Sequence, residues 1–172
     1  MNDEMNELIP HVDSDGITKG FITRAYAHGG ERPLHPVVHL HVFNSKHELY
    51  LQKRPEWKDI QPGKWDTATG GHVSYGESIG DALRREVAEE LGIKDFEPRF
   101  LVKYIFESDR ERELVYVHTC VYDGDVIPNK EELDGGRFWT ISEIKESEGK
   151  GIMTPNFEYE FERFLLNEPC NS

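Results

Sequence analysis

The chain has 172 residues, with 33 acidic and 20 basic side chains and a formal net charge of −13. This length fits one domain with its own core, and we expect a single domain over 1–172, with a core over about 7–166 and a frayed C-terminal tail. The acidic balance disfavours a nucleic-acid or anionic-membrane partner. It leaves a phosphorylated small molecule open as a ligand, because a site can carry its own cations.

Cysteine usage and hydropathy indicate the compartment. The two cysteines, Cys120 and Cys170, lie far apart and give no disulfide framework, which fits a reducing cytoplasm. There is no apolar run of about 18 residues and no signal-peptide pattern at the acidic start of the sequence. We therefore expect a cytoplasmic protein.

Strand and helix patterns alternate along the chain. Residues 7–24 are expected to form a β-hairpin that turns at 13–16, and residues 36–43 and 48–54 a second hairpin. Further strands are expected near 65–73, 99–107, 113–122 and 137–140, helices over 78–91 and 156–166, and loops over 55–64 and 123–136. Mixed strands with two helices predict an α/β sandwich.

The helix over 78–91 has unusual glutamates. At about 100° per residue its apolar side chains form one stripe, composed of Ile79, Ala82, Leu83, Val87 and Leu91. Glu86 and Glu90 project within or beside this stripe, and Glu89 lies at its edge. Solvated glutamates belong on the opposite side. Glu86 and Glu90 also form an i, i+4 like-charge pair, which costs roughly 0.2–0.5 kcal/mol even when exposed. A hard cation such as Mg²⁺, shared with phosphate oxygens, would remove that repulsion.

These residues belong to a longer pattern: Gly71, five residues, Glu77, seven residues, and then Arg85-Glu86-Val87-Ala88-Glu89-Glu90-Leu91-Gly92-Ile93. The pattern matches the Nudix box in full, so the chain resembles the Nudix hydrolase superfamily. The resemblance implies an α/β/α sandwich around a mixed sheet and Mg²⁺- or Mn²⁺-dependent hydrolysis of a diphosphate in a nucleoside diphosphate derivative. It implies metal binding by Glu86, Glu89, Glu90 and the Gly71 carbonyl, with Glu77 and Arg85 bracing the loop against the helix.

The resemblance extends to the superfamily branch that contains isopentenyl-diphosphate isomerase, over about residues 7 to 165. That family binds a metal through three histidines and two glutamates. The matching positions here are occupied by His28, His35, His72, Glu111 and Glu113. This implies a second metal site, for which Mn²⁺ or Zn²⁺ would also be suitable. The residues that match the isomerase's diphosphate-binding positions are Arg24, Arg54 and Lys58.

One departure from the isomerase pattern is informative. The isomerase has a catalytic cysteine two residues before the third histidine, and this chain has Gly70 there. Without that thiol, one partner for proton transfer is missing. We therefore predict a hydrolase acting on acid anhydrides in phosphorus-containing compounds, with a small-molecule diphosphate substrate. Two alternatives stay open: an isomerase that uses Glu113 without a cysteine, and a non-catalytic nucleotide sensor. The resemblance also makes a homodimer possible.

Other candidates have ordinary interpretations beside the functional ones. His39 and His41 share one face of a strand and are interpreted as ordinary strand residues. Glu131 and Glu132 lie in a loop from which some Nudix hydrolases recruit a base, although a solvated acidic loop is the simpler interpretation. Trp139 is expected in the core. Trp57 and Tyr75 are candidates to line a pocket.

Overall fold

The structure is a computed structural model in which residues 3–166 are described. The strands are β1 (Leu8–Val12), β2 (Thr18–Thr23), β3 (Leu34–Phe43), β4 (Leu49–Lys53), β5 (Trp65–Thr67), β6 (Thr69–His72), β7 (Arg99–Glu107), β8 (Arg112–Val121) and β9 (Gly136–Trp139). The helices are α1 (Arg24–Ala27), α2 (Ile79–Leu91), α3 (Ile141–Ser147) and α4 (Pro155–Glu160), with a 3-10 turn at Asp3–Asn6 and a π-helical turn at Phe161–Leu165.

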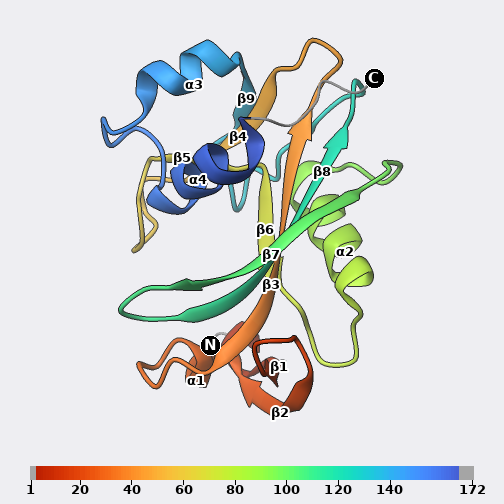
Figure 1. The fold of residues 1–172 in the computed structure, drawn as a ribbon, viewed down its shortest axis with the longest axis vertical. Coiled ribbons are helices and arrows are strands. Elements are labelled where there is room, and N and C mark those ends of the chain that lie inside the picture. Colours follow the sequence, from red (N-terminus) through yellow and green to blue (C-terminus); the bar gives the residue numbers. More distant parts are fainter. Residues whose placement is uncertain (1–2, 167–172) are drawn as a thin grey trace.

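A mixed seven-stranded sheet organises the molecule. Its main order is β5-β4-β3-β8-β7, with β6 paired to β3 and β9 paired to β4. The long central strands β3 and β8 run parallel, and their register sets His35 beside Glu113. On the other edge of β3, the antiparallel strand β6 pairs Gly70 with His39 and Gly71 with Val38. A separate hairpin of β1 and β2 lies at the end of the molecule that holds α1 (Figure 1).

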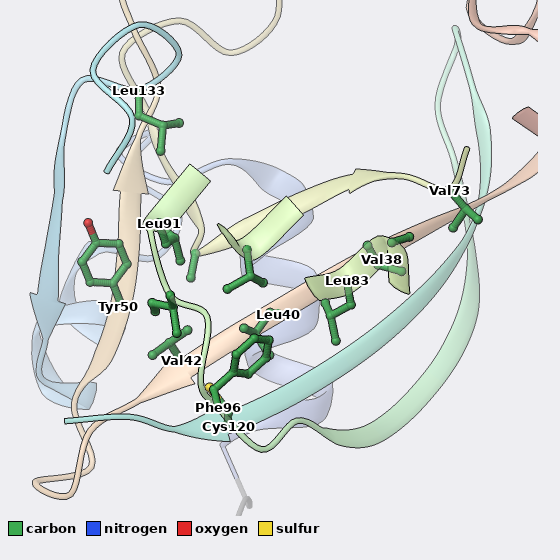
Figure 2. Packing of buried hydrophobic residues seen from close by; sticks show 14 residues of the cluster. Val38, Leu40, Val42, Tyr50, Val73, Leu83, Leu91, Phe96, Cys120 and Leu133 are labelled. Carbon is green, nitrogen blue, oxygen red and sulfur yellow. The ribbon is translucent and has the colours of Figure 1, made fainter. Parts of the chain in front are cut away.

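The two faces of this sheet are covered by different helices (Figure 1). Alternate residues of β3 (Val38, Leu40 and Val42) pack against the apolar stripe of α2, as the close view of this core shows (Figure 2). Phe43 faces the other way and packs with Ile144 of α3 and Phe157 of α4. The strand alternation thus directs successive β3 side chains to opposite faces of the sheet, and the result is the α/β/α sandwich.

Most predicted elements are confirmed, with some differences. The hairpin at 7–24 forms, and its turn is held by Asp13 Oδ1, which accepts hydrogen bonds from the Asp15 and Ile17 amides. The single strand expected over 65–73 is two strands that pair with different partners. The helix expected over 156–166 is α4 followed by the π-helical turn.

Two helices were missed by the sequence reasoning. The pattern did not indicate α1 or α3, because four and seven residues are too few to show an apolar period. Both are marked instead by caps: Thr23 accepts from the Tyr26 amide, and Thr140 forms a capping box with Glu143. The predicted frayed tail after Leu166 lies outside the described residues. Within residues 3–166, no helix has the length and apolar character needed to cross a bilayer.

Candidate functional site

Strand β6 separates two groups of polar side chains. An added Cβ at Gly71 would collide with the Glu86 carboxyl group, so this residue faces α2. An added Cβ at Gly70 would lie 3.0 Å from Cδ2 and 3.3 Å from Nε2 of His39, on the opposite face. His72 points to the same side as Gly70 because side chains alternate along a strand. The candidate site therefore has an acidic cluster on the α2 face and a histidine cluster on the α4 face.

Helix α2 has the boundaries that the sequence indicated. Ser78 caps its first turn by accepting from the Asp81 amide, and Gly92 ends it in the left-handed conformation with φ of 67°. Ala82, Leu83, Val87 and Leu91 are buried. This packing fixes the rotation of the helix, so Glu86 and Glu90 point toward β6 instead of solvent.

Arg85 joins the helix to the preceding loop. Its Nε donates to Glu77 Oε2 at 2.7 Å, and one terminal nitrogen donates to the His72 carbonyl at 3.1 Å. The other terminal nitrogen lies 2.8 Å from Glu86 Oε1 and 3.5 Å from Glu89 Oε2. Glu77 in turn accepts from the Ser74 amide at 2.8 Å. The structure thus brings Glu77 and Arg85 together as a brace between loop and helix.

Glu90 lacks such a cation among residues 3–166. Within that range its buried Oε1 has no hydrogen-bond partner, although the carboxylate accepts a backbone hydrogen bond from Gly70. Burial, followed by the charges of Glu86 and Glu132, raises the pKa of Glu90 well above its ordinary value. Burial also raises the pKa of Glu86, against the opposing effect of Arg85. Glu89 differs from both, because its side chain is 55% exposed.

The loop over 123–136 contacts the end of α2. The amides of Ile127 and Asn129 donate to the carbonyls of Leu91 and Glu90, both at 2.9 Å. This holds Glu132 near enough for its charge to act on Glu86 and Glu90. Glu131 is exposed, and its amide donates to Asn129 Oδ1 at 3.0 Å. Of the two loop glutamates, Glu132 has the electrostatic connection to the cluster.

The histidine cluster brings together five residues from four parts of the chain. His28 follows α1, His35 lies on β3, His72 ends β6, Glu111 precedes β8, and Glu113 lies on β8. His28 Nε2 is 3.2 Å from His72 Nε2, and His28 Nδ1 is 3.1 Å from Glu111 Oε1. Two nitrogen ligands about 2.1 Å from a tetrahedral ion lie roughly 3.4 Å apart, close to the His28–His72 separation.

His35 is oriented as a ligand. Its Nδ1 donates to the Pro33 carbonyl at 3.0 Å, which leaves Nε2 unprotonated in the neutral ring. That Nε2 is buried and has no hydrogen-bond partner. Burial lowers the pKa of His35 and, more strongly, that of His72, so both rings favour the neutral form that binds metals. Burial and the adjacent Glu111 raise the pKa of Glu113 to about 8.

The two clusters differ in how closely their ligand atoms converge. In the described part of the chain, the groups with at least three potential ligand atoms within 4.8 Å of one another are His28–His35–His72 and His35–Glu111–Glu113. The box carboxylates do not form such a group. Arg85 holds Glu86 and Glu89 toward its own guanidinium, whereas Glu90 is buried beside Gly70.

The three predicted phosphate-binding cations have different surroundings. The charge of Arg24 lowers the pKa of His35 and His72, which places it beside the histidine cluster. Arg54 donates through Nε and one terminal nitrogen to the Ile60 carbonyl, at 3.1 and 2.8 Å, and lies 3.5 Å from Asp66. Lys58 lies with its Nζ 4.9 Å from the centre of the Trp57 ring.

His39 and His41 lie in β3, as predicted, and both contact a buried carboxylate that the sequence did not indicate. His39 Nδ1 lies 2.7 Å from Glu160 Oε2, and His41 Nε2 lies 2.8 Å from Glu160 Oε1. Tyr104 also donates to Glu160 Oε2, at 2.6 Å. The strand pattern placed the two histidines on one face, but nothing in it indicated the partner. The available signal was Glu160 beside the apolar residues Phe157 and Phe161 of the last helix, all of which are buried.

The three aromatic candidates have different surroundings in the structure. Trp139 is buried, as predicted, with its ring centre 5.1 Å from that of Trp65. Trp57 is 68% exposed. Tyr75 is also mostly exposed and packs on Phe21 of β2, with ring centres 4.6 Å apart. These contacts do not place either exposed ring in a pocket, so a role in substrate binding stays a prediction.

The fold is an α/β/α sandwich in which a glutamate of α2 lies directly against Gly71 of β6. This chain belongs to the Nudix family, because the NUDIX domain model matches residues 33–157. Divalent metal ions are generally used in that family.

Relatives of known name support this assignment. The chain is 31% identical to isopentenyl-diphosphate Delta-isomerase 1 of Photorhabdus laumondii, over 94% of this chain and 96% of that protein. It is 36% identical to an uncharacterised Nudix hydrolase of Pseudomonas aeruginosa, over 77% and 78% of the two chains.

Solved structures agree on the fold. A MutT protein of Methanosarcina mazei is 28% identical, with a TM-score of 0.66, over 77% of this chain and 94% of that one. The DR0079 protein of Deinococcus radiodurans is 24% identical with a TM-score of 0.73, over 89% and 96%, and supports the fold alone.

Proposed function

We propose that this protein hydrolyses a diphosphate linkage in a nucleoside diphosphate derivative or a related small molecule, with a divalent cation bound at the Nudix box. The observation that carries the proposal is the buried Glu90 Oε1, which has no hydrogen-bond partner and faces repulsion from Glu86 and Glu132. A buried carboxylate in such surroundings is stabilised by a cation, and Arg85 contacts the other two box glutamates instead.

The residues fit Mg²⁺ or Mn²⁺. Glu86, Glu89 and Glu90 offer carboxylate oxygens, and the Gly71 carbonyl is a further candidate ligand. Because a Cβ at Gly71 would collide with the Glu86 carboxyl, glycine is what allows the strand and the helix side chain to approach. When bound there, such a cation supplies neutralisation of phosphate charge and acidification of water.

The protein's own residues would accept the proton, hold the substrate and position the loop. Glu132 is the favoured acceptor for the proton of the attacking water, because it is exposed and its charge reaches Glu86 and Glu90. Arg24, Arg54 and Lys58 are the candidates to hold the phosphate that is not attacked. Arg85 and Glu77 would keep the loop after β6 in register with α2.

We further propose that the histidine cluster binds a second metal ion. The support is the buried His35 Nε2 without a hydrogen-bond partner and the convergence of His28, His72, Glu111 and Glu113 around it. The ligand set of imidazole and carboxylate suits Mn²⁺ and Zn²⁺ as well as Mg²⁺. An ion here would add positive charge on the α4 face of β6, where Arg24 lies.

An isomerase acting on an isoprenoid diphosphate is a second candidate, favoured by the 31% identity to such an enzyme over 94% of the chain. In that case Glu113 would be the proton-transferring residue. Two observations weigh against it. Gly70 has no thiol, and the His39 ring lies 3.0 Å from where a side chain at that position would begin. The polar His39 and Glu160 pair would also be a poor neighbour for a hydrocarbon chain.

A product assay tests the proposal. The purified protein is incubated with Mg²⁺, and separately with Mn²⁺, and a pool of diphosphate compounds that includes isopentenyl diphosphate. Products are identified by mass spectrometry after chromatography, with a chelator control. Metal-dependent cleavage of a pool member supports the hydrolase. Formation of dimethylallyl diphosphate without cleavage supports the isomerase. Tight binding of a nucleotide with no product would instead favour a sensor.

A further inference from the structure

The buried pair of His39 and Glu160 has no part in the function proposed above. Glu160 is 0% exposed, on a helix whose neighbouring side chains are apolar. Its carboxylate is contacted by His39, His41 and Tyr104 within 2.8 Å. A carboxylate with three donors and no solvent retains its negative charge, and the pKa of Glu160 is lowered by His39 and His41 against the effect of burial.

The two histidines of this network are not equivalent. The His41 side chain is 0% exposed, and its Nδ1 is buried without a hydrogen-bond partner. The His39 side chain keeps 10% of its surface exposed. His39 Nδ1 faces the fully buried Glu160, so Nε2 lies on the edge of the ring that points away from this carboxylate. The small exposed fraction of His39 distinguishes it from His41.

The edge of the ring that carries Nε2 lies over a position of β6 that has no side chain, Gly70. Gly70 is the β6 partner of His39, and an added Cβ there would lie 3.3 Å from Nε2. The backbone of Gly70 also hydrogen-bonds to Glu90 of the acidic cluster. On the α4 face, the charges of His39 and Glu113 act on each other. His39 thus lies between the two clusters, beside one backbone position that connects them.

The contact with Glu160 also affects which ring nitrogens of His39 carry hydrogen. Opposed by burial, the Glu160 charge and hydrogen bond raise the pKa of His39 to about 9, so near neutral pH both ring nitrogens are donors. A donor fixed over a glycine, in a site for phosphates, is suited to an anionic oxygen.

We propose that His39 is a substrate-binding residue, which donates from Nε2 over Gly70 to an anionic oxygen of a bound diphosphate. Glu160 is then a positioning residue, because it holds the ring through Nδ1 and keeps it cationic. The inference rests on the proposed class of ligand, a diphosphate, but not on hydrolysis. A purely structural pair would serve only to satisfy polar groups within the core.

Binding of methylenediphosphonate, a diphosphate analogue that resists hydrolysis, provides the test. Its affinity is measured by calorimetry in Mg²⁺, for the wild-type protein and for variants, with the melting temperature of each. In His39→Asn the amide nitrogen approximates Nδ1, so the bond to Glu160 is kept and the donor over Gly70 is lost. We expect affinity to fall about 10- to 100-fold, the effect of one hydrogen bond to a charged group. His39→Gln, whose amide nitrogen approximates Nε2, should recover part of that loss.

His41→Asn is the matched control. It removes the other imidazole from Glu160 at a position that no ligand reaches, so we expect it to lower the melting temperature and change affinity less than 3-fold. Equal losses of affinity in the His39→Asn and His41→Asn proteins would overturn the inference, as would no loss in either. Failure of the wild-type protein to bind the analogue would overturn it too. Binding that depends on His39, in a protein that cleaves nothing, would instead refute only the proposed hydrolysis.

Discussion

The acidic cluster and the histidine cluster lie on opposite faces of one glycine strand, and they are built differently. One helix supplies all the glutamates of the first, spaced so that neighbouring turns present them together. Four separate parts of the chain supply the second, and its ligand atoms form groups of three that lie within 4.8 Å of one another. In the first cluster, burial and the neighbouring carboxylates oppose the negative charge of Glu90. The second contains imidazoles whose pKa values are lowered by burial. This difference suggests that a cation is needed mainly to bring the glutamates together, but would enter a preformed site among the histidines.

Glu90→Gln gives the largest expected effect. The change keeps the size of the side chain but removes the buried charge, so turnover of the substrate should fall by roughly three orders of magnitude. The fold should persist, and the melting temperature should be unchanged or higher, because burial of the charge is unfavourable. Steady-state kinetics and thermal melting measure the two effects. Near-normal turnover in this variant would remove the acidic cluster from the proposed mechanism.

His28→Ala addresses the second cluster. Loss of an outer-shell partner already costs about 10- to 100-fold in metal affinity, so loss of a ligand should cost at least about 100-fold. Equilibrium dialysis against Mn²⁺, with elemental analysis, should show one ion fewer than in the wild-type protein. His11→Ala, outside both clusters, serves as the control. Unchanged metal content in the His28→Ala protein would mean that this cluster holds no ion.

Arg85→Gln tests the brace between loop and helix. The variant loses the bonds to Glu77, Glu86 and the His72 carbonyl, and we expect kcat/KM to fall about 10- to 100-fold. Arg84→Gln is the comparison, since the neighbouring guanidinium lies over the Phe96 ring at 5.2 Å, away from the carboxylates. Similar losses of kcat/KM in the two variants would show that loss of either arginine from this helix lowers activity, whether or not the brace is broken.

The last prediction concerns how the stability of the fold depends on pH, and it involves the smallest expected effect on turnover. The pKa of His39 is raised from 6.5 to about 9 by Glu160, with support from Glu113 and Asp66. A raised pKa stabilises the fold fully below pH 6.5, and the contribution disappears as the pH rises through about 9. The shift corresponds to about 3 kcal/mol. Glu160 has a lowered pKa, so its part is present above about pH 4.5 and lost on acidification. Both shifts describe one interaction and are not added.

Thermal unfolding at several pH values measures this, as the difference between the wild-type protein and Glu160→Gln. The difference should be largest near pH 5 to 6.5 and shrink toward pH 9. The subtraction removes most of the contribution of the other titrating carboxylates, which both proteins share. A difference that is constant with pH would mean that His39 is neutral in the folded protein.

The comparison also explains how far the sequence could be interpreted. Helix α2 was predicted with its cap residues and its glutamates, because local periodicity determines all of them. The pairing of Arg85 with Glu77 followed from the family pattern. The histidine cluster needed the resemblance, since no local rule brings residues from four parts of the chain together.

Other features depended on tertiary contacts. The contact between His39 and Glu160 joins residues 121 positions apart, and a buried ion pair leaves no periodic signal. The split of 65–73 into two strands was hidden because Ala68 lies between strands that pair with β4 and β3 respectively. The short helices α1 and α3 could have been found from their threonine caps. Lys58 was assigned to phosphate from the family resemblance, and its contact with Trp57 could not be foreseen from the sequence.

The most direct measurement is cleavage of the diphosphate pool in ¹⁸O-labelled water with Mg²⁺, with products weighed by mass spectrometry. Hydrolysis at a Nudix box predicts one ¹⁸O atom in one phosphorylated product, dependence on the metal, and loss of the signal in the Glu90→Gln protein. The contradicting result would be a metal-loaded wild-type protein that releases no ¹⁸O-labelled phosphate product, whether it isomerises isopentenyl diphosphate or leaves the whole pool unchanged.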